Sequence, residues 1–140
     1  MGARFVVQVR VRSYELDWND HVNHTVYHRY GEHARSEHFL AAGCRFTELA
    51  RHGLGIVLLE TNVRFLRELR LGDEVEIDSR PEFGTGRTFT MDHTMTRADG
   101  VVACEMTCRI GLIDATARRL VADPADRLRE VATDPAVLGL

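Results

Sequence analysis

The sequence predicts an α+β domain in which an antiparallel sheet packs against one long helix. Two observations carry this prediction. Between residues 23 and 43, apolar residues recur at three- and four-residue steps, which is the period of a helix with one buried face. On both sides of that segment, apolar and polar residues alternate, which is the period of half-buried strands. The length of 140 residues predicts a single domain spanning residues 1–140.

The first strand and the helix have clear signals. Every second residue from Phe5 to Val11 is apolar, which predicts a strand with one buried face. Asn23 is placed to cap the helix, and the stripe from Tyr27 to Ala41 continues to Gly43, a natural end. The helix therefore has about five turns. Residues Phe46 to His52 predict a short helical piece before Gly53.

The rest of the chain predicts four strands and a short terminal helix. The continuous apolar run from Ile56 to Leu59 predicts a strand covered on both faces. Asp99-Gly100 predicts a hairpin between two alternating runs. The alternating runs are residues 75–79, 89–95 and 102–112. Pro124 to Val131 predicts the terminal helix, with Asp123 as N-cap and Pro124 at the first helical position.

Composition limits the class of partner. The net charge of -3 and a pI of about 6.1 give no basic field for nucleic acid. Arginines cluster between Arg64 and Arg70. This cluster is interpreted either as a solvated strand edge and loop or as a docking patch for a phosphate-bearing carrier. No stretch approaches the roughly 18 apolar residues of a membrane span, and no signal peptide is recognised. The cysteines Cys44, Cys104 and Cys108 have no zinc-type spacing, and the last two fit a strand's apolar face. We therefore expect a cytoplasmic protein.

One segment carries a family signature. Residues 16–24 read Leu-Asp-Trp-Asn-Asp-His-Val-Asn-His, and Tyr27 follows. The segment resembles the D-x-N-x-H-V-N-N-x-x-Y segment of hot-dog thioesterases, including bacterial acyl-CoA thioesterases, the 4-hydroxybenzoyl-CoA thioesterase-like family and plant-type acyl-acyl carrier protein thioesterases. Glu32-x-x-Arg35 and Leu71-Gly72-Asp73-Glu74-Val75 are also similar, and the similarity covers Arg4 to Leu128. His24 stands where the family has the second asparagine.

The resemblance implies a fold, an assembly and a reaction. The implied fold is the hot-dog fold, a curved antiparallel sheet of five or six strands wrapped around one long central helix. The implied assembly is a homodimer or homotetramer joined through its sheets, with active sites at the subunit interface and no metal or cofactor. The implied reaction is hydrolysis of an acyl-CoA to free acid and CoA. The alternatives are an acyl carrier protein thioesterase, a hot-dog dehydratase or hydratase, and a non-catalytic module that binds acyl thioesters.

Asp17 is the main catalytic candidate. A carboxylate just before a helix can attack a thioester carbonyl or activate a water molecule. Backbone N–H groups at the start of that helix, around Val22 to His24, can polarise the carbonyl oxygen. The alternative is that Asp17 only caps the loop or the helix.

The remaining candidates surround Asp17 or belong to the following strands. His21 and Asn19 are expected to assist Asp17, and the alternative for both is to hold the loop. The expected substrate-binding residues are Asn23, His24, Tyr27, Glu60 and Arg64. Glu60 either faces the cleft as a second acid or pairs with an arginine such as Arg64. A metal held by the histidines near Asp17 is a weaker alternative, because no complete ligand pattern accompanies them.

Overall fold

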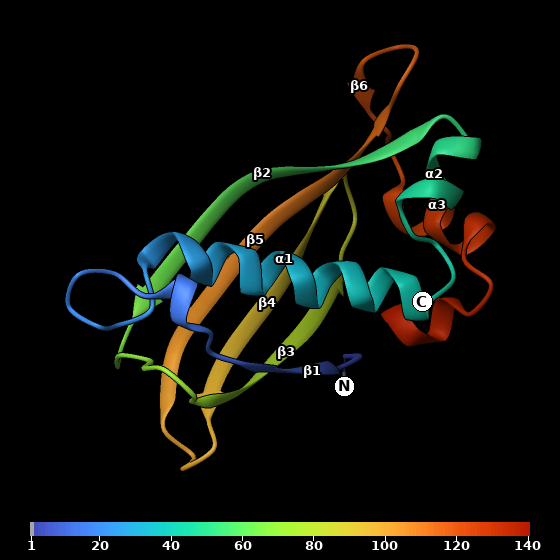
Figure 1. The fold of residues 1–140 in the computed structure, drawn as a ribbon. Helices are drawn as coiled ribbons and strands as arrows, with labels where there is room; N and C mark the ends of the chain where they lie inside the picture. The colour runs from blue at the N-terminus through green and yellow to red at the C-terminus, as the bar shows by residue number, and fades with distance from the viewer. Residues whose placement is uncertain (1) are drawn as a thin grey trace.

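The computed structural model describes residues 2–140, in which a curled antiparallel sheet wraps around one long helix (Figure 1). The sheet strands are β1 (Phe5–Arg10), β2 (Leu54–Phe65), β3 (Glu74–Phe83), β4 (Thr88–Arg97), β5 (Val102–Asp114) and the short β6 (Arg119–Leu120). The α-helices are α1 (His24–Ala41), α2 (Phe46–Arg51) and α3 (Pro124–Val131). Two 3-10 turns, Ser13–Glu15 and Pro135–Leu138, complete the order.

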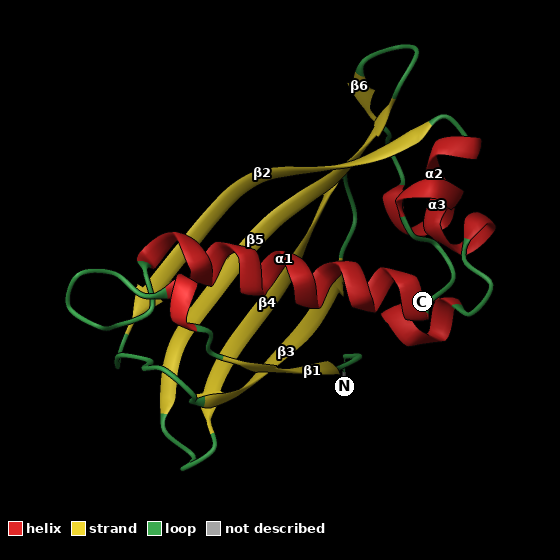
Figure 2. Cartoon of the chain, in the orientation of Figure 1, coloured by secondary structure: helices red, strands yellow, loops and turns green. Residues whose placement is uncertain are grey.

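The strand order is β1-β3-β4-β5-β2, every pairing is antiparallel, and β6 pairs only with β5. Helix α1 lies across the concave face of this sheet (Figure 2). The arrangement is the predicted hot-dog fold, which is confirmed. The same order leaves β1 and β2 as the two edges of the main sheet, and β2 is the longer of them.

Helix α1 begins and ends at the residues that the sequence indicated. The Asn23 side chain accepts a hydrogen bond from the Thr25 N–H at 2.9 Å, so Asn23 is the N-cap. Gly43 follows the helix with a φ of +74°, a conformation that favours glycine. Gly31 lets the helix approach the sheet, because a Cβ at this position would lie 2.6 Å from Met106 Sδ.

Strand β5 shows how alternation builds the core. The side chains of Cys104, Met106, Cys108 and Ile110 are buried on the face that packs against α1, whereas Glu105, Thr107 and Arg109 on the other face are exposed. The predicted core positions of Cys104 and Cys108 are therefore confirmed. Both thiols have a raised pKa because burial disfavours the thiolate.

The strand predicted at Ile56 to Leu59 is confirmed, but its predicted burial on both faces was wrong. These residues belong to β2, but β2 is an edge strand, and Leu58 and Leu59 are 51% and 46% exposed. The register shifts between Leu58 and Glu60, which is a β-bulge at Leu59. A bulge interrupts the alternation of side chains, so the apolar run reflects this irregularity and not burial on both faces.

Candidate active site

The loop before α1 is folded around the Asp17 carboxylate. Asp17 Oδ1 accepts hydrogen bonds from the backbone N–H groups of Asn19 at 2.8 Å and His21 at 3.2 Å. The Asp17 N–H donates to the His21 carbonyl at 2.7 Å. Asp20 turns the chain with a φ of +59°, which aspartate tolerates better than most residues. Oδ2 of Asp17 makes no hydrogen bond within residues 2–140, so this oxygen is available to a ligand.

The loop is attached to the domain on both sides. The Val22 N–H donates to the Leu69 carbonyl at 2.8 Å, and the Asn23 N–H donates to the Glu15 carbonyl at 2.8 Å. The buried Glu15 side chain accepts a hydrogen bond from the Tyr30 hydroxyl at 2.8 Å. Because these contacts come from the 66–73 segment and from α1, Asp17 is held at a defined position relative to the helix start.

Asp17 lies on the wall of an open hollow of about 360 Å³ between the start of α1 and the end of β2. The loop and α1 contribute Asp17, His21, Val22, His24 and Tyr27, and the other wall is the segment 65–68. Four of the residues predicted from the sequence therefore lie together in the structure: Asp17, His21, His24 and Tyr27.

Tyr27 and Phe65 form the apolar part of the hollow. Their rings meet edge to face with centroids 5.2 Å apart. Tyr27 is almost fully buried, and burial raises the pKa of its hydroxyl to about 12, so the group is neutral at physiological pH. Phe65 is 53% exposed, which makes it a side chain that a ligand can cover.

The backbone amides at the helix start are more restricted than the sequence analysis expected. The N–H groups of Val22 and Asn23 already donate to carbonyl groups, so neither is free to polarise a substrate. The His24 N–H makes no hydrogen bond within residues 2–140, and His24 lines the hollow. His24 is thus the member of this set whose amide can bind a carbonyl oxygen.

The structure does not bring four of the named residues into the hollow. Asn19 contributes its backbone N–H to Asp17, and the Asn23 side chain caps α1. Glu60 pairs with Arg109 at 3.4 Å and not with Arg64, and it is exposed. Arg64 lies opposite Glu105 in the register with β5, on the face of the sheet that points away from α1.

The segment after β2 contributes residues that sequence reasoning did not assign to the site. Phe65, Leu66 and Glu68 line the hollow, and Arg67 does so within the arginine group that the sequence analysis noted. No local pattern marks Leu66 or Glu68, because their role depends on a segment that lies next to α1 only in the folded chain. Among residues 2–140, no group of three or more His, Cys, Asp or Glu side chains is arranged to hold a metal ion.

The curled antiparallel sheet around one long helix places this chain in the hot-dog fold class. The model of the thioesterase-like superfamily matches residues 11–132, so the chain belongs to this superfamily. No helix within residues 2–140 is long and apolar enough to cross a membrane.

Curated relatives agree with this membership. The chain is 34% identical over 87 residues to the acyl-acyl carrier protein thioesterase ATL3 of Arabidopsis thaliana, covering 62% of this chain and 46% of that protein. It is 31% identical over 99 residues to a putative esterase of Aquifex aeolicus, covering 71% and 77%. It is 26% identical over 116 residues to the long-chain acyl-CoA thioesterase FadM of Escherichia coli, covering 82% and 87%. The match spans less than half the length of the Arabidopsis relative.

Solved structures share the fold over most of the chain. The probable thioesterase YbaW from Escherichia coli superposes with a TM-score of 0.80 at 25% identity, covering 89% of this chain and 93% of that one. A Staphylococcus aureus protein solved in complex with CoA superposes with a TM-score of 0.82 at 20% identity, covering 93% and 84%. The second likeness concerns the fold alone.

Proposed function

We propose that this protein hydrolyses an acyl-CoA to the free acid and CoA, with Asp17 as the catalytic carboxylate. One observation carries the proposal. Asp17 is fixed through Oδ1 by two backbone N–H groups, and its Oδ2 remains without a partner within residues 2–140 on the wall of a hollow. A carboxylate that is oriented on one side and free on the other suits a nucleophile or a general base.

The surrounding groups support this chemistry. The thioester carbonyl is proposed to lie between Asp17 and the His24 N–H, which polarises the carbonyl oxygen as charge develops on it. Asp17 either attacks the carbonyl carbon, expels the thiolate and forms an anhydride that water then hydrolyses, or it takes a proton from a water molecule that attacks the carbonyl carbon directly. The thiol of the leaving group has a pKa of about 8.5, so it departs as the thiolate without a strong acid. His21 lies beside Asp17 in the same wall and assists it.

The test is the release of free thiol from a panel of acyl-CoAs, with short, long and aromatic acyl groups, by the purified protein. Turnover of some members is expected and would name the acyl class. The same acyl groups on an acyl carrier protein form the second half of the panel, because Arabidopsis relatives are named for that substrate. If only the carrier-bound substrates are hydrolysed, the substrate is an acyl carrier protein thioester and not an acyl-CoA. No turnover on either half would favour a non-catalytic binding module.

The active assembly is proposed to be a homodimer, or a homotetramer built from such dimers, joined along β2. This strand is an edge of the sheet, so its outer N–H and C=O groups need partners. The exposed side chains of Leu58, Leu59 and Phe65 follow the same strand. Two antiparallel copies of β2 place the Phe65 end of one strand beside the Leu58 end of the other, and the open hollow then gains a wall from the second subunit.

Charge complementarity predicts the register of this dimer. If Asn62 lies on the two-fold axis, Glu60 lies opposite Arg64 of the partner subunit. Changing Glu60→Arg is expected to shift the protein towards monomer, because like charges then face each other. The double variant Glu60→Arg with Arg64→Glu restores opposite charges across the axis but faces Arg109 and Glu105 with like charges within each subunit, so it is expected to recover part of the dimer. Sedimentation at several protein concentrations measures both, and a double variant no better than the single one would contradict this register.

A further inference from the structure

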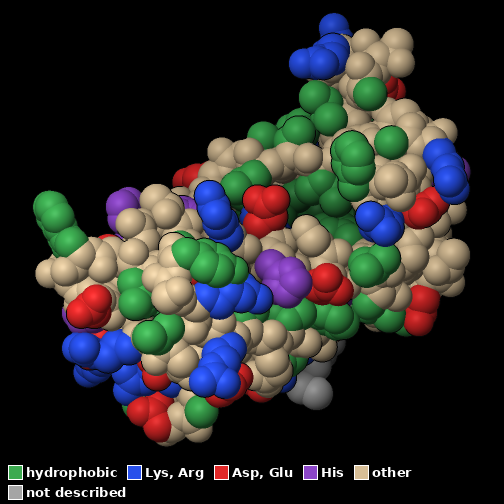
Figure 3. Space-filling model, in the orientation of Figure 1, with side chains coloured by type: hydrophobic (Ala, Val, Ile, Leu, Met, Phe, Trp, Pro, Cys, Tyr) green, Lys and Arg blue, Asp and Glu red, His purple; other side chains and the backbone are tan. Residues whose placement is uncertain are grey.

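A second cavity, of about 560 Å³, lies between α1, α2 and β2. In Figure 3 this region is hollowed and shows hydrophobic side chains inside it. Phe39, Leu40, Phe46, Ile56, Leu58 and Ile110 supply its apolar lining. The volume is in the range of small-molecule sites, which are mostly apolar with a few placed polar groups.

One largely buried cation lines this cavity, whose other polar lining residues are Glu32, Ser36, Glu37 and Arg45. Arg35, on α1, is only 9% exposed, whereas the neighbouring Glu32 and Arg45 on the rim are exposed. The Arg35 Nη1 group lies 3.3 Å from His93 Nε2 and donates to Cys108 Sγ at 3.2 Å. His93 belongs to β4 and Cys108 to β5, so the guanidinium is anchored to the concave face of the sheet.

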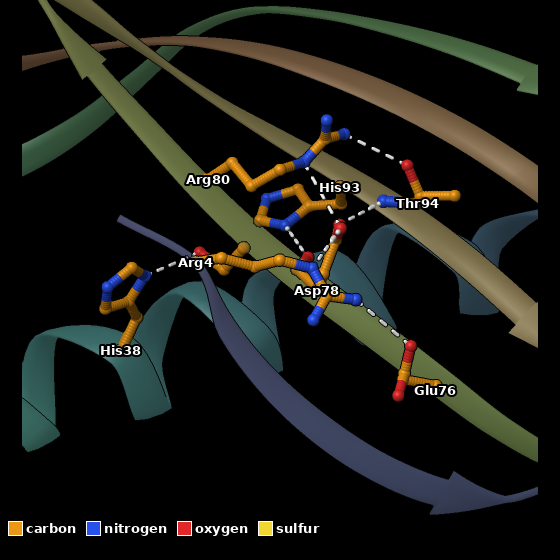
Figure 4. A network of polar contacts seen from close by, with 8 residues as sticks. Arg4, His38, Glu76, Asp78, Arg80, His93 and Thr94 are labelled. Atoms are coloured by element: carbon orange, nitrogen blue, oxygen red, sulfur yellow. Dashed lines mark hydrogen bonds and ion pairs between the residues drawn. The ribbon is translucent and has the colours of Figure 1, made fainter. Parts of the chain in front are cut away.

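Both acceptors of Arg35 are neutral. The His93 Nδ1 lies 2.8 Å from the Asp78 carbonyl, to which it must donate (Figure 4). Nε2 therefore presents a lone pair to Arg35. Burial lowers the pKa of His93 to about 4, so the ring carries no charge at neutral pH. Burial also raises the pKa of Cys108, which remains a thiol.

No carboxylate of residues 2–140 forms an ion pair with Arg35, although Glu32 and Glu37 line the same cavity. Within residues 2–140, no carboxylate oxygen lies within 4.0 Å of its nitrogen atoms, and Nε and Nη2 make no hydrogen bond. A buried charge without a counter-charge is costly, and arginine is the side chain best suited to bind a carboxylate with two parallel hydrogen bonds. The Nε and Nη2 groups of Arg35 are therefore available to donate hydrogen bonds to an anion in the cavity.

We propose that this cavity binds the far end of an acyl group that carries a carboxylate there, with Arg35 as its counter-ion. Arg35 comes eight residues after Tyr27, which is about 12 Å along α1 from the Asp17 hollow. An acyl chain whose thioester lies at Asp17 is proposed to extend beside α1 as far as Arg35. The substrate class is an acyl thioester with a remote carboxylate, and this refinement rests on the proposed thioesterase function.

Binding can be tested without turnover. Hexanoate and hexan-1-ol share a chain length and differ in the carboxylate, so thermal unfolding is measured with millimolar amounts of each. Hexanoate is expected to raise the melting temperature of the wild type and not of Arg35→Met, and hexan-1-ol is expected to have little effect on either. Arg45→Met, which removes an exposed arginine of the same cavity, is the matched control and should respond like the wild type. Equal stabilisation of Arg35→Met by hexanoate would overturn the proposal.

The enzymatic arm compares pairs of equal chain length, such as adipoyl-CoA with hexanoyl-CoA. The wild type is expected to prefer the carboxylate-bearing member by at least about tenfold in kcat/KM, and Arg35→Met is expected to lose this preference while still hydrolysing hexanoyl-CoA. Arg35→Lys, which keeps the charge, should retain part of it. An unchanged ratio in Arg35→Met would contradict the assignment. If hexanoate does not bind but hydrolysis is normal, only the proposed carboxylate site at Arg35 is contradicted. If hexanoate binds but no acyl-CoA is hydrolysed, the proposed thioesterase function is contradicted.

Sedimentation distinguishes a second possible partner of Arg35, a carboxylate from another copy of the chain. If the carboxylate that neutralises Arg35 belongs to a second copy of the chain, Arg35→Met will weaken the dimer, and sedimentation will show more monomer than for Arg45→Met. That result would overturn the ligand proposal. Under the ligand proposal, Arg35→Met stays folded and dimeric and melts no lower than the wild type, because an apolar side chain of similar length replaces a buried charge without an ion pair.

Discussion

Asp17→Asn is expected to lower kcat/KM by at least about a hundredfold on every acyl-CoA that the wild type hydrolyses. The amide is neither a nucleophile nor a base for this reaction. The fold should be unaffected, because the asparagine Oδ1 can still accept the hydrogen bonds that the Asn19 and His21 N–H groups donate to Asp17. Thiol release measures the rate, and the melting temperature verifies the fold.

Asp20→Asn is the matched control for this prediction. Asp20 lies in the same loop, is exposed, and has a positive φ that asparagine adopts readily. The control removes the same charge three residues along the same loop. A general electrostatic effect on activity would therefore appear in both variants. If both lose activity equally, or if Asp17→Asn keeps wild-type activity, Asp17 is not the catalytic group.

Gly43→Ala is expected to destabilise the protein by about 3 kcal/mol or more, because it combines a strained backbone conformation with a steric overlap. Gly43 has a φ of +74°, which is strained for alanine. A Cβ there would also overlap Thr133 Oγ1 and lie 3.1 Å from the Thr133 backbone nitrogen. Thr133 cannot easily retreat, because the next residue, Asp134, donates its N–H to the Ala42 carbonyl at 3.0 Å. Urea unfolding measures the loss.

Gly53→Ala isolates the backbone contribution. Gly53 has a similar φ of +69°, but a Cβ there would meet no atom within 4 Å. Only the left-handed conformation is penalised, so a loss of about 1 kcal/mol is expected. Equal losses in the two variants would show that the 133–134 segment moves away from the end of α1 at little cost.

Local signals predicted much of the fold. Asn23 and Gly43 bracket α1 because capping is a property of a few neighbouring residues, and the alternation in β5 follows from the pleat of a strand. The predicted burial of Ile56 to Leu59 on both faces was wrong for a physical reason. Whether a strand is an edge depends on its pairing with residues about fifty positions away, and a bulge at Leu59 disturbs the alternation that would have revealed it.

The site could be predicted only in part. Asp17, His21, His24 and Tyr27 belong to one contiguous segment, and the family signature named them together. The opposite wall at 65–68 reaches the hollow through the path of β2, which no short motif encodes. The environment of Arg35 was equally hidden, because His93 and Cys108 come from strands far along the chain.

The burial of the three cysteines has a practical consequence for experiments on this protein. Cys44, Cys104 and Cys108 are each fully enclosed, and burial raises the pKa of Cys44 to about 11 and that of Cys104 to about 12. Only a thiolate reacts quickly with a disulfide dye. The native protein should therefore stay silent in a dye assay that counts liberated CoA. In a control without substrate, a slow colour change would report the rare openings of the core that expose these thiols. The same dye therefore measures both turnover and the rate of core opening.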